Sequence, residues 1–131
     1  NDYISYFGLC DGTGAAAPNN GFYFETIADA APTEPLNYFA VCADGGVRTR
    51  TDTGVAIGSV FTKFRIVCDG AGTAYYYIDD VLKATLGGGL GTNFPDDEVD
   101  GYNPALQLRK TVGTGARNLQ VDYYVMRYEY T

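Results

Sequence analysis

Histidine is absent from this chain of 131 residues, and so is tryptophan. Without an imidazole, neither a Ser-His-Asp triad nor a Cys-His nucleophile pair can be assembled. The same absence leaves no histidine to complete a zinc site, and the three cysteines do not show a Cys-x-x-Cys spacing. The sequence therefore argues against hydrolases that use a Ser-His-Asp triad or a Cys-His pair, and against a zinc site.

Cysteine is scarce, and Cys10, Cys42 and Cys68 form an odd set. Two of them have the option of pairing as a disulfide. Each lies in an apolar, strand-like stretch, however, where a free thiol behaves as a small hydrophobic side chain. We expect three reduced core cysteines and assembly in a reducing cytoplasm.

Long apolar runs and basic clusters are also missing. No stretch approaches the length that spans a bilayer, and the first residues lack a basic segment followed by a hydrophobic one. A formal net charge of −7 repels phosphate backbones, and the nine basic residues are scattered. We expect neither a membrane nor a nucleic acid as partner. The chain begins in strand-like sequence without methionine, which suggests a processed product or part of a longer polypeptide.

No helical periodicity persists, whereas glycine (17 residues) and tyrosine (12 residues) are abundant. This composition is typical of short strands joined by turns. The length suits one domain, over residues 1–131, and is too short for two. The sequence predicts an all-β fold, a sandwich of two antiparallel sheets. The expected strands are Asp2 to Cys10, Gly21 to Ile27, Asn37 to Ala43, Val47 to Thr51, Thr53 to Ile57, Phe61 to Cys68, Thr73 to Ile78, a strand from Val81, Ala105 to Thr111, and Leu119 to Tyr130.

The central stretch from Phe61 to Leu86 predicts a β-meander of three strands. In its first strand Phe64 and Ile66 alternate with polar residues, as expected for a sheet buried on one side. Gly70 and Gly72 are expected to supply the positive φ that a tight hairpin needs.

The second turn of the meander, Asp79-Asp80, allows two registers. A two-residue turn pairs Ile78 with Val81. A three-residue turn with a bulge pairs Ile78 with Leu82 and keeps Leu82 and the alternate residues up to Leu86 on the core face. We prefer the second register, because it buries the more apolar set.

Six motifs stand in order along the chain: Gly8-Leu9-x-Asp11, Pro18-x-x-Gly21-Phe22-Tyr23-Phe24, Asp52-Thr53-Gly54-Val55, Phe64-Arg65-Ile66, Tyr76-Tyr77-Ile78-Asp79 and Leu119-x-Val121-Asp122-Tyr123. Together they resemble the concanavalin A-like lectin/glucanase superfamily and, more narrowly, the laminin-G-like jelly-roll modules of tailed-bacteriophage virion proteins. The resemblance covers nearly the whole chain from Phe7 onward. One departure is Asp80, where the family's hairpin more often has glycine.

The resemblance implies a jelly-roll β-sandwich with one concave sheet, and family members bind sugars there or serve as passive structural modules. It implies a non-catalytic virion structural or decoration module on a phage capsid, tail or fibre. Adhesion to a glycan or host surface is the leading role beyond assembly. The alternatives are a carbohydrate-binding module accessory to an enzyme and a degenerate glucanase. The implied location is the virion, or a reducing bacterial cytoplasm during assembly, and the implied partners are virion or self-assembling subunits in an oligomer.

Glucanases of this superfamily use carboxylates in a Glu-x-Asp-x-x-Glu pattern, in which alternate acids share one face of a strand. Glu98-Val99-Asp100 begins that pattern, but Gly101 to Pro104 follow and the third acid is missing. We therefore predict that the protein is not an enzyme.

The acidic loop is the candidate metal site. Asp96, Asp97 and Asp100, together with Glu98, present the carboxylate oxygens that Ca²⁺ prefers. The loop lacks the spacing of an EF-hand, and a solvated surface loop is the simpler interpretation. We expect no cofactor, with Ca²⁺ at these aspartates as the alternative.

Tyrosines make the candidate binding site. Tyr75, Tyr77, Tyr102, Tyr124 and Tyr128 are expected to project from the sheet face away from the aliphatic core. Such rings either stack on a sugar or pack against a neighbouring subunit. We favour the subunit interface, because tryptophan, a frequent platform for sugars, is absent.

Overall fold

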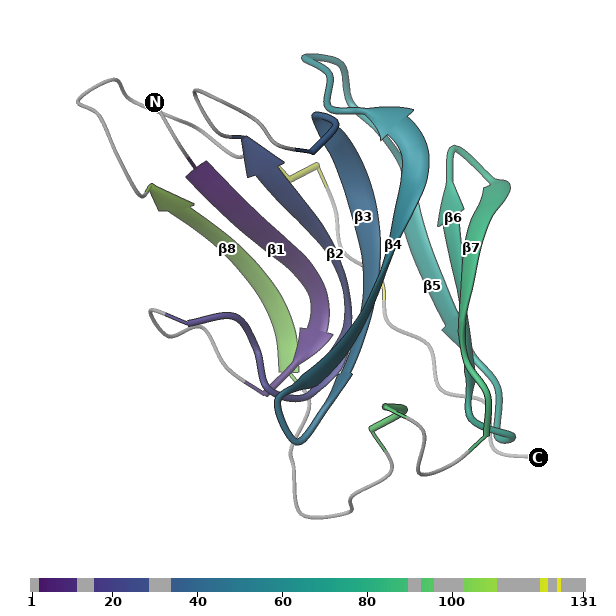
Figure 1. Ribbon diagram of the computed structural model, residues 1–131. Helices are drawn as coiled ribbons and strands as arrows, with labels where there is room; N and C mark the ends of the chain where they lie inside the picture. Colours follow the sequence, from purple (N-terminus) through teal and green to yellow (C-terminus); the bar gives the residue numbers. More distant parts are fainter. Residues whose placement is uncertain are drawn as a thin grey trace.

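The strands of the protein form two antiparallel sheets (Figure 1). The computed structural model describes residues 3–11, 16–28, 34–89, 93–95, 103–110, 121–122 and 125. Within these residues there are eight strands and no helix, so the predicted all-β sandwich is confirmed. The strands are β1 (Tyr3–Cys10), β2 (Gly21–Ala28), β3 (Asn37–Asp44), β4 (Val47–Ala56), β5 (Phe64–Cys68), β6 (Thr73–Ile78), β7 (Val81–Gly87) and β8 (Asn103–Lys110).

The larger sheet contains five strands in the order β4-β3-β2-β1-β8. β1 lies between β2 and β8, so that Phe7 pairs with Phe24 on one side and with Leu106 on the other. Side chains alternate across β2. Phe24 faces the second sheet, whereas Tyr23 belongs to a separate buried cluster on the opposite face. The alternation of β2 therefore agrees with the sequence pattern.

The chain leaves the larger sheet after β4 and returns to it at β8. β8 corresponds to the strand predicted over Ala105 to Thr111, although it begins at Asn103. The last predicted strand, Leu119 to Tyr130, lies outside the described residues except for residues 121, 122 and 125, and these three are not in a strand.

The smaller sheet is the predicted meander, in the order β5-β6-β7. β6 has the predicted bounds, Thr73–Ile78. β5 begins later than predicted, at Phe64, and the Phe61 side chain before it is 75% exposed. The meander is thus confirmed with a shorter first strand.

The turn between β5 and β6 uses one of the two predicted glycines. Gly72 has a positive φ of 86°, whereas Gly70 does not take a positive φ, so that prediction is wrong for Gly70. Instead, the Asp69 carboxylate accepts the backbone N–H groups of Ala71 (3.0 Å) and Thr73 (2.9 Å). An aspartate that bonds to the backbone in this way shapes a turn without a left-handed residue at its centre.

The turn between β6 and β7 differs from our preferred register. Ile78 pairs with Val81 and not with Leu82, so the connection is a two-residue turn. Both turn residues have positive φ, 49° at Asp79 and 64° at Asp80. Two-residue hairpin turns favour this conformation because it follows the twist of the flanking strands, and aspartate tolerates it better than most residues.

The predicted bulge exists, but it lies inside the β6–β7 pair rather than in the turn. Tyr77 pairs with Leu82, and Tyr76 pairs with Ala84. The extra residue between them returns Ala84 and Leu86 to the buried face, as predicted. Leu82 is 48% exposed, so its expected place in the core is wrong.

Replacing Asp80 with glycine is expected to raise the free energy of unfolding. A left-handed conformation costs a non-glycine residue about 1–2 kcal/mol, somewhat less for aspartate. The substitution also removes the ion pair with Lys63 (2.8 Å), which is exposed and screened by solvent, so its loss offsets only a small part of that gain. The free energy of unfolding, measured by urea denaturation, should therefore rise by about 1 kcal/mol.

Asp79→Gly is the matched control for this substitution. Asp79 accepts the backbone N–H of Lys63 (3.0 Å) through its side chain, and glycine removes that acceptor. Asp79→Gly should therefore stabilise less than Asp80→Gly. A larger gain from Asp79→Gly would contradict the assignment of strain to position 80.

β4 is one continuous strand where the sequence predicted two. Its register against β3 shifts near the predicted break, which is therefore a bulge. Gly54 takes the left-handed conformation there, with a φ of 68°. The Thr53 hydroxyl donates to the carbonyl of Tyr38 at 2.6 Å, so the bulged segment remains bonded to β3.

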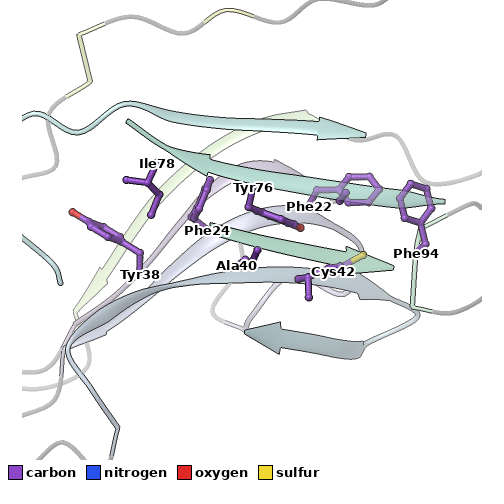
Figure 2. Close-up of a cluster of buried hydrophobic side chains, with 11 residues drawn as sticks. Phe22, Phe24, Tyr38, Ala40, Cys42, Tyr76, Ile78 and Phe94 are labelled. Atoms are coloured by element: carbon purple, nitrogen blue, oxygen red, sulfur yellow. The ribbon is translucent and has the colours of Figure 1, made fainter. Parts of the chain in front are cut away.

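The main hydrophobic core lies between the two sheets (Figure 2). Phe24 has ring contacts with Phe7, Phe64 and Tyr76, at centroid distances of 5.6, 4.9 and 5.3 Å. Tyr76 is fully buried, and its hydroxyl donates to the carbonyl of Val41 at 2.5 Å. Burial raises the pKa of Tyr76 well above its usual value. These contacts join the facing sheets through aromatic side chains.

The cysteine prediction is confirmed at two positions and wrong at the third. Cys10 and Cys42 are buried and free. Burial raises the pKa of Cys42 to about 12, and its thiol donates to the carbonyl of Asn93 at 2.8 Å. Cys68 is also free but exposed, because it is the last residue of β5 at the edge of the described three-stranded sheet.

Candidate functional site

Only some of the predicted site residues are described. Tyr75 and Tyr77 lie on β6. Within the described residues, no group of three or more acidic, cysteine or histidine side chains is placed to hold a metal ion. The calcium hypothesis stays a prediction about the acidic loop. The predicted residues outside the described part are Tyr102, Tyr124, Tyr128, Asp96, Asp97 and Asp100.

Tyr75 and Tyr77 project from the outer face of the three-stranded sheet, as predicted. Residues 74, 76 and 78 of β6 are buried, whereas the alternate residues are half-buried. Cross-strand pairing places side chains of β5 and β7 beside the two tyrosines. We call this surface the tyrosine face, and its residues are Arg65, Val67, Tyr75, Tyr77, Leu82 and Thr85.

The ring of Tyr75 is fixed at its hydroxyl. The hydroxyl donates to Asp69 Oδ2 at 3.1 Å. This hydrogen bond raises the pKa of Tyr75. The backbone N–H of Thr73 lowers the pKa of Asp69, with further lowering from Ala71 and from Tyr75. The carboxylate therefore connects the β5–β6 turn to the tyrosine face.

The ring of Tyr77 is held by a cation. The guanidinium carbon of Arg65 lies 3.7 Å from the ring centroid of Tyr77, on the neighbouring strand. Val67 and Leu82 flank the two tyrosines and are 39% and 48% exposed. The tyrosine face thus combines two held aromatic rings with exposed aliphatic side chains.

A second candidate surface, which is polar and which the sequence did not predict, lies on the outer face of the five-stranded sheet. Glu25 is 1% exposed, and its Oε2 accepts hydrogen bonds from Arg48 Nη2 (2.6 Å) and Arg50 Nε (2.9 Å). The guanidinium of Arg50 also lies 3.6 Å from the ring centroid of Phe39. We call Glu25, Arg48 and Arg50 the arginine cluster.

Two tyrosines adjoin the arginine cluster. Tyr23 is fully buried, and the guanidinium of Arg48 lies 5.8 Å from its ring centroid. Tyr6 packs edge-on against Tyr23 at 5.7 Å. Burial raises the pKa of both hydroxyls, and the charge of Glu25 raises it further. Both phenols therefore stay neutral at physiological pH.

The sequence contains only part of the signal for this cluster. Glu25 is the one charged residue in the predicted strand Gly21 to Ile27, and Arg48 and Arg50 are two residues apart in a strand, which puts them on one face. Their meeting depends on β3 lying between β2 and β4. Alternation within single strands does not provide that order.

Comparisons with models of protein families, with curated proteins and with solved structures find no match for this chain. The concanavalin A-like resemblance therefore stays a prediction carried by the motifs of the sequence. In the part of the chain described here, no helix has the length and apolarity to cross a membrane.

Proposed function

We propose that this chain is a non-catalytic structural module, of the virion structural or decoration kind, and that copies of it assemble through the tyrosine face. The observation that carries this proposal is that exposed Val67 and Leu82 flank two tyrosines already held by Asp69 and Arg65. Pre-ordered aromatic side chains beside aliphatic ones suit protein interfaces, because little side-chain entropy is lost on contact.

The same geometry argues against a sugar platform. Sugars stack on open aromatic faces, and the Arg65 guanidinium covers one face of the Tyr77 ring. A carbohydrate-binding module remains the alternative function. It requires displacement of Arg65 or use of other rings, whereas a protein interface accommodates the Arg65–Tyr77 pair as it stands.

The double variant Val67→Lys, Leu82→Lys tests the assembly proposal. Both positions are exposed, so lysine should leave folding intact, but burying either ammonium in an interface is unfavourable. In sedimentation equilibrium we expect the unsubstituted chain to form an oligomer and the double variant to self-associate at least about tenfold more weakly.

Val47→Lys is the matched control, because Val47 is 57% exposed on β4 in the other sheet. It should leave the oligomer unchanged. A chain that stays monomeric at millimolar concentration, or equal weakening by Val47→Lys, would contradict assembly through the tyrosine face. Saturable binding of neutral glycans with shifts at Tyr75 and Tyr77 would favour the carbohydrate-binding alternative.

A further inference from the structure

The arginine cluster carries an excess of positive charge in its buried part. One buried carboxylate, Glu25, is shared by two guanidiniums, Arg48 and Arg50. Glu34 reaches only Arg50 (2.5 Å), and its side chain is 49% exposed at the rim. Because solvent screens a pair at the rim, Glu34 compensates the buried charge weakly. Two guanidiniums therefore share one buried carboxylate, and the second carboxylate, Glu34, lies at the exposed rim.

The cluster also has donors without acceptors. Arg48 Nε and Arg50 Nη2 are buried and have no hydrogen-bond partner in the part of the chain that the structure describes. A buried donor without an acceptor costs about 1–3 kcal/mol, and more where the donor is charged. Both donors belong to neighbouring side chains on one face of β4. Acceptors supplied at this place would satisfy these donors.

A third arginine lies on the same face. Tyr6 pairs with Gln107, and Ile4 pairs with Arg109. Arg109 therefore lies on the same face of the five-stranded sheet as Tyr6 and the arginine cluster. The charges of Arg48, Arg109 and Arg50 all act on the Tyr6 hydroxyl, opposing the effect of its burial on the pKa. Three of the nine basic residues of an acidic chain thus act electrostatically on one tyrosine, together with Glu25.

We propose that this face binds an oxyanionic group, a carboxylate or a sulfate, through Arg48 and Arg50. Guanidinium groups bind such oxyanions through paired N–H donors, and a bound oxyanion supplies both an acceptor and a further negative charge close to the guanidiniums. A water molecule supplies only the acceptor. The side chains of Arg48 and Arg50 are 28% and 21% exposed, so a ligand contacts the guanidiniums from solvent, and a shift of these side chains is needed to bring the two buried donors to it.

The proposed site is independent of the assembly role of the tyrosine face, because the two surfaces lie on the outer faces of different sheets. The test is an NMR titration that follows the arginine side-chain Nε–H signals. Sodium glucuronate and sodium sulfate serve as the two probes, against sodium chloride at matched ionic strength. We expect saturable shifts of the Arg48 and Arg50 signals. The probe that binds more tightly shows whether the site prefers a carboxylate or a sulfate.

Three variants test whether the anion binds at the arginine cluster. Arg50→Lys keeps the charge but loses the paired donors, and binding should weaken at least about tenfold. Arg65→Lys, on the tyrosine face, is the matched control and should leave binding unchanged. Glu25→Gln removes the internal competitor for both guanidiniums, so binding should become tighter.

Several results would overturn the proposal. Shifts no larger than those caused by chloride would show that the cluster is only structural. Equal weakening by Arg65→Lys, or no tightening in Glu25→Gln, would show that general charge rather than this cluster attracts the anion. Because the titration of the unsubstituted protein decides the first outcome, the proposal stays testable even if a variant fails to fold.

Discussion

Replacing Gly8 with alanine is expected to destabilise the protein by at least about 3 kcal/mol, a large part of the stability of a small domain. Gly8 has a φ of 155°, and a Cβ there would lie 2.3 Å from the carbonyl oxygen of Phe22 and 2.6 Å from Cα of Tyr23. Both are backbone atoms, so no side-chain rotation relieves the clash. β1 must move away from β2, and urea denaturation measures the loss.

Gly70→Ala is the matched control. A Cβ at Gly70 has no neighbour within 4 Å, and the residue does not have a positive φ. Alanine also restricts the unfolded chain, so we expect a change between zero and a gain of about 1 kcal/mol. If Gly8→Ala lowered the free energy of unfolding no more than Gly70→Ala does, this result would contradict the close approach of β1 and β2 at Gly8.

The sequence predicted the strands well where their formation depends on neighbouring residues. Aromatic and β-branched residues predicted β6 with its bounds, and the alternation of Tyr76 and Ile78 with Tyr75 and Tyr77 placed the latter two on the outer face. The aspartate and glycine turns predicted the hairpins on either side. These signals are local, because the two-residue period and the turn chemistry are properties of a few adjacent residues.

The sequence predicted register less well. Our preferred turn placed a bulge at Asp79-Asp80, whereas the structure places it between Leu82 and Ala84. Both arrangements return Ala84 and Leu86 to the core, so burial alone does not distinguish them. The position of a bulge depends on how facing side chains pack across two strands, and alternation within one strand carries no information about it.

The arginine cluster could not be predicted for a related reason. The burial of Glu25 depends on Arg48 and Arg50 reaching it from β4, with β3 between them. Each of the three residues, taken alone, is an ordinary charged residue in a strand. Only the order of strands in the sheet turns them into a buried ionic group, and that order is set by long-range pairing.

Phe24→Ala is the second substitution for which we expect a large loss, about 3–5 kcal/mol in the free energy of unfolding. Phe24 is 1% exposed and contacts Phe7 within its own sheet and Phe64 and Tyr76 in the facing sheet. Alanine leaves a cavity between the sheets and removes three ring contacts together. The loss should appear in urea denaturation and as a lower melting temperature.

Two further variants separate the cavity from the loss of an aromatic ring. Phe24→Leu retains most of the buried volume, so it should cost about 1–2 kcal/mol. Phe61→Ala removes a ring that is 75% exposed before β5, and its effect should stay within about 0.5 kcal/mol. Equal losses from Phe24→Ala and Phe61→Ala would contradict the packing of the two sheets around Phe24. The expected order, with Phe24→Leu between them, would show that the loss at position 24 follows the buried volume that is removed between the facing sheets.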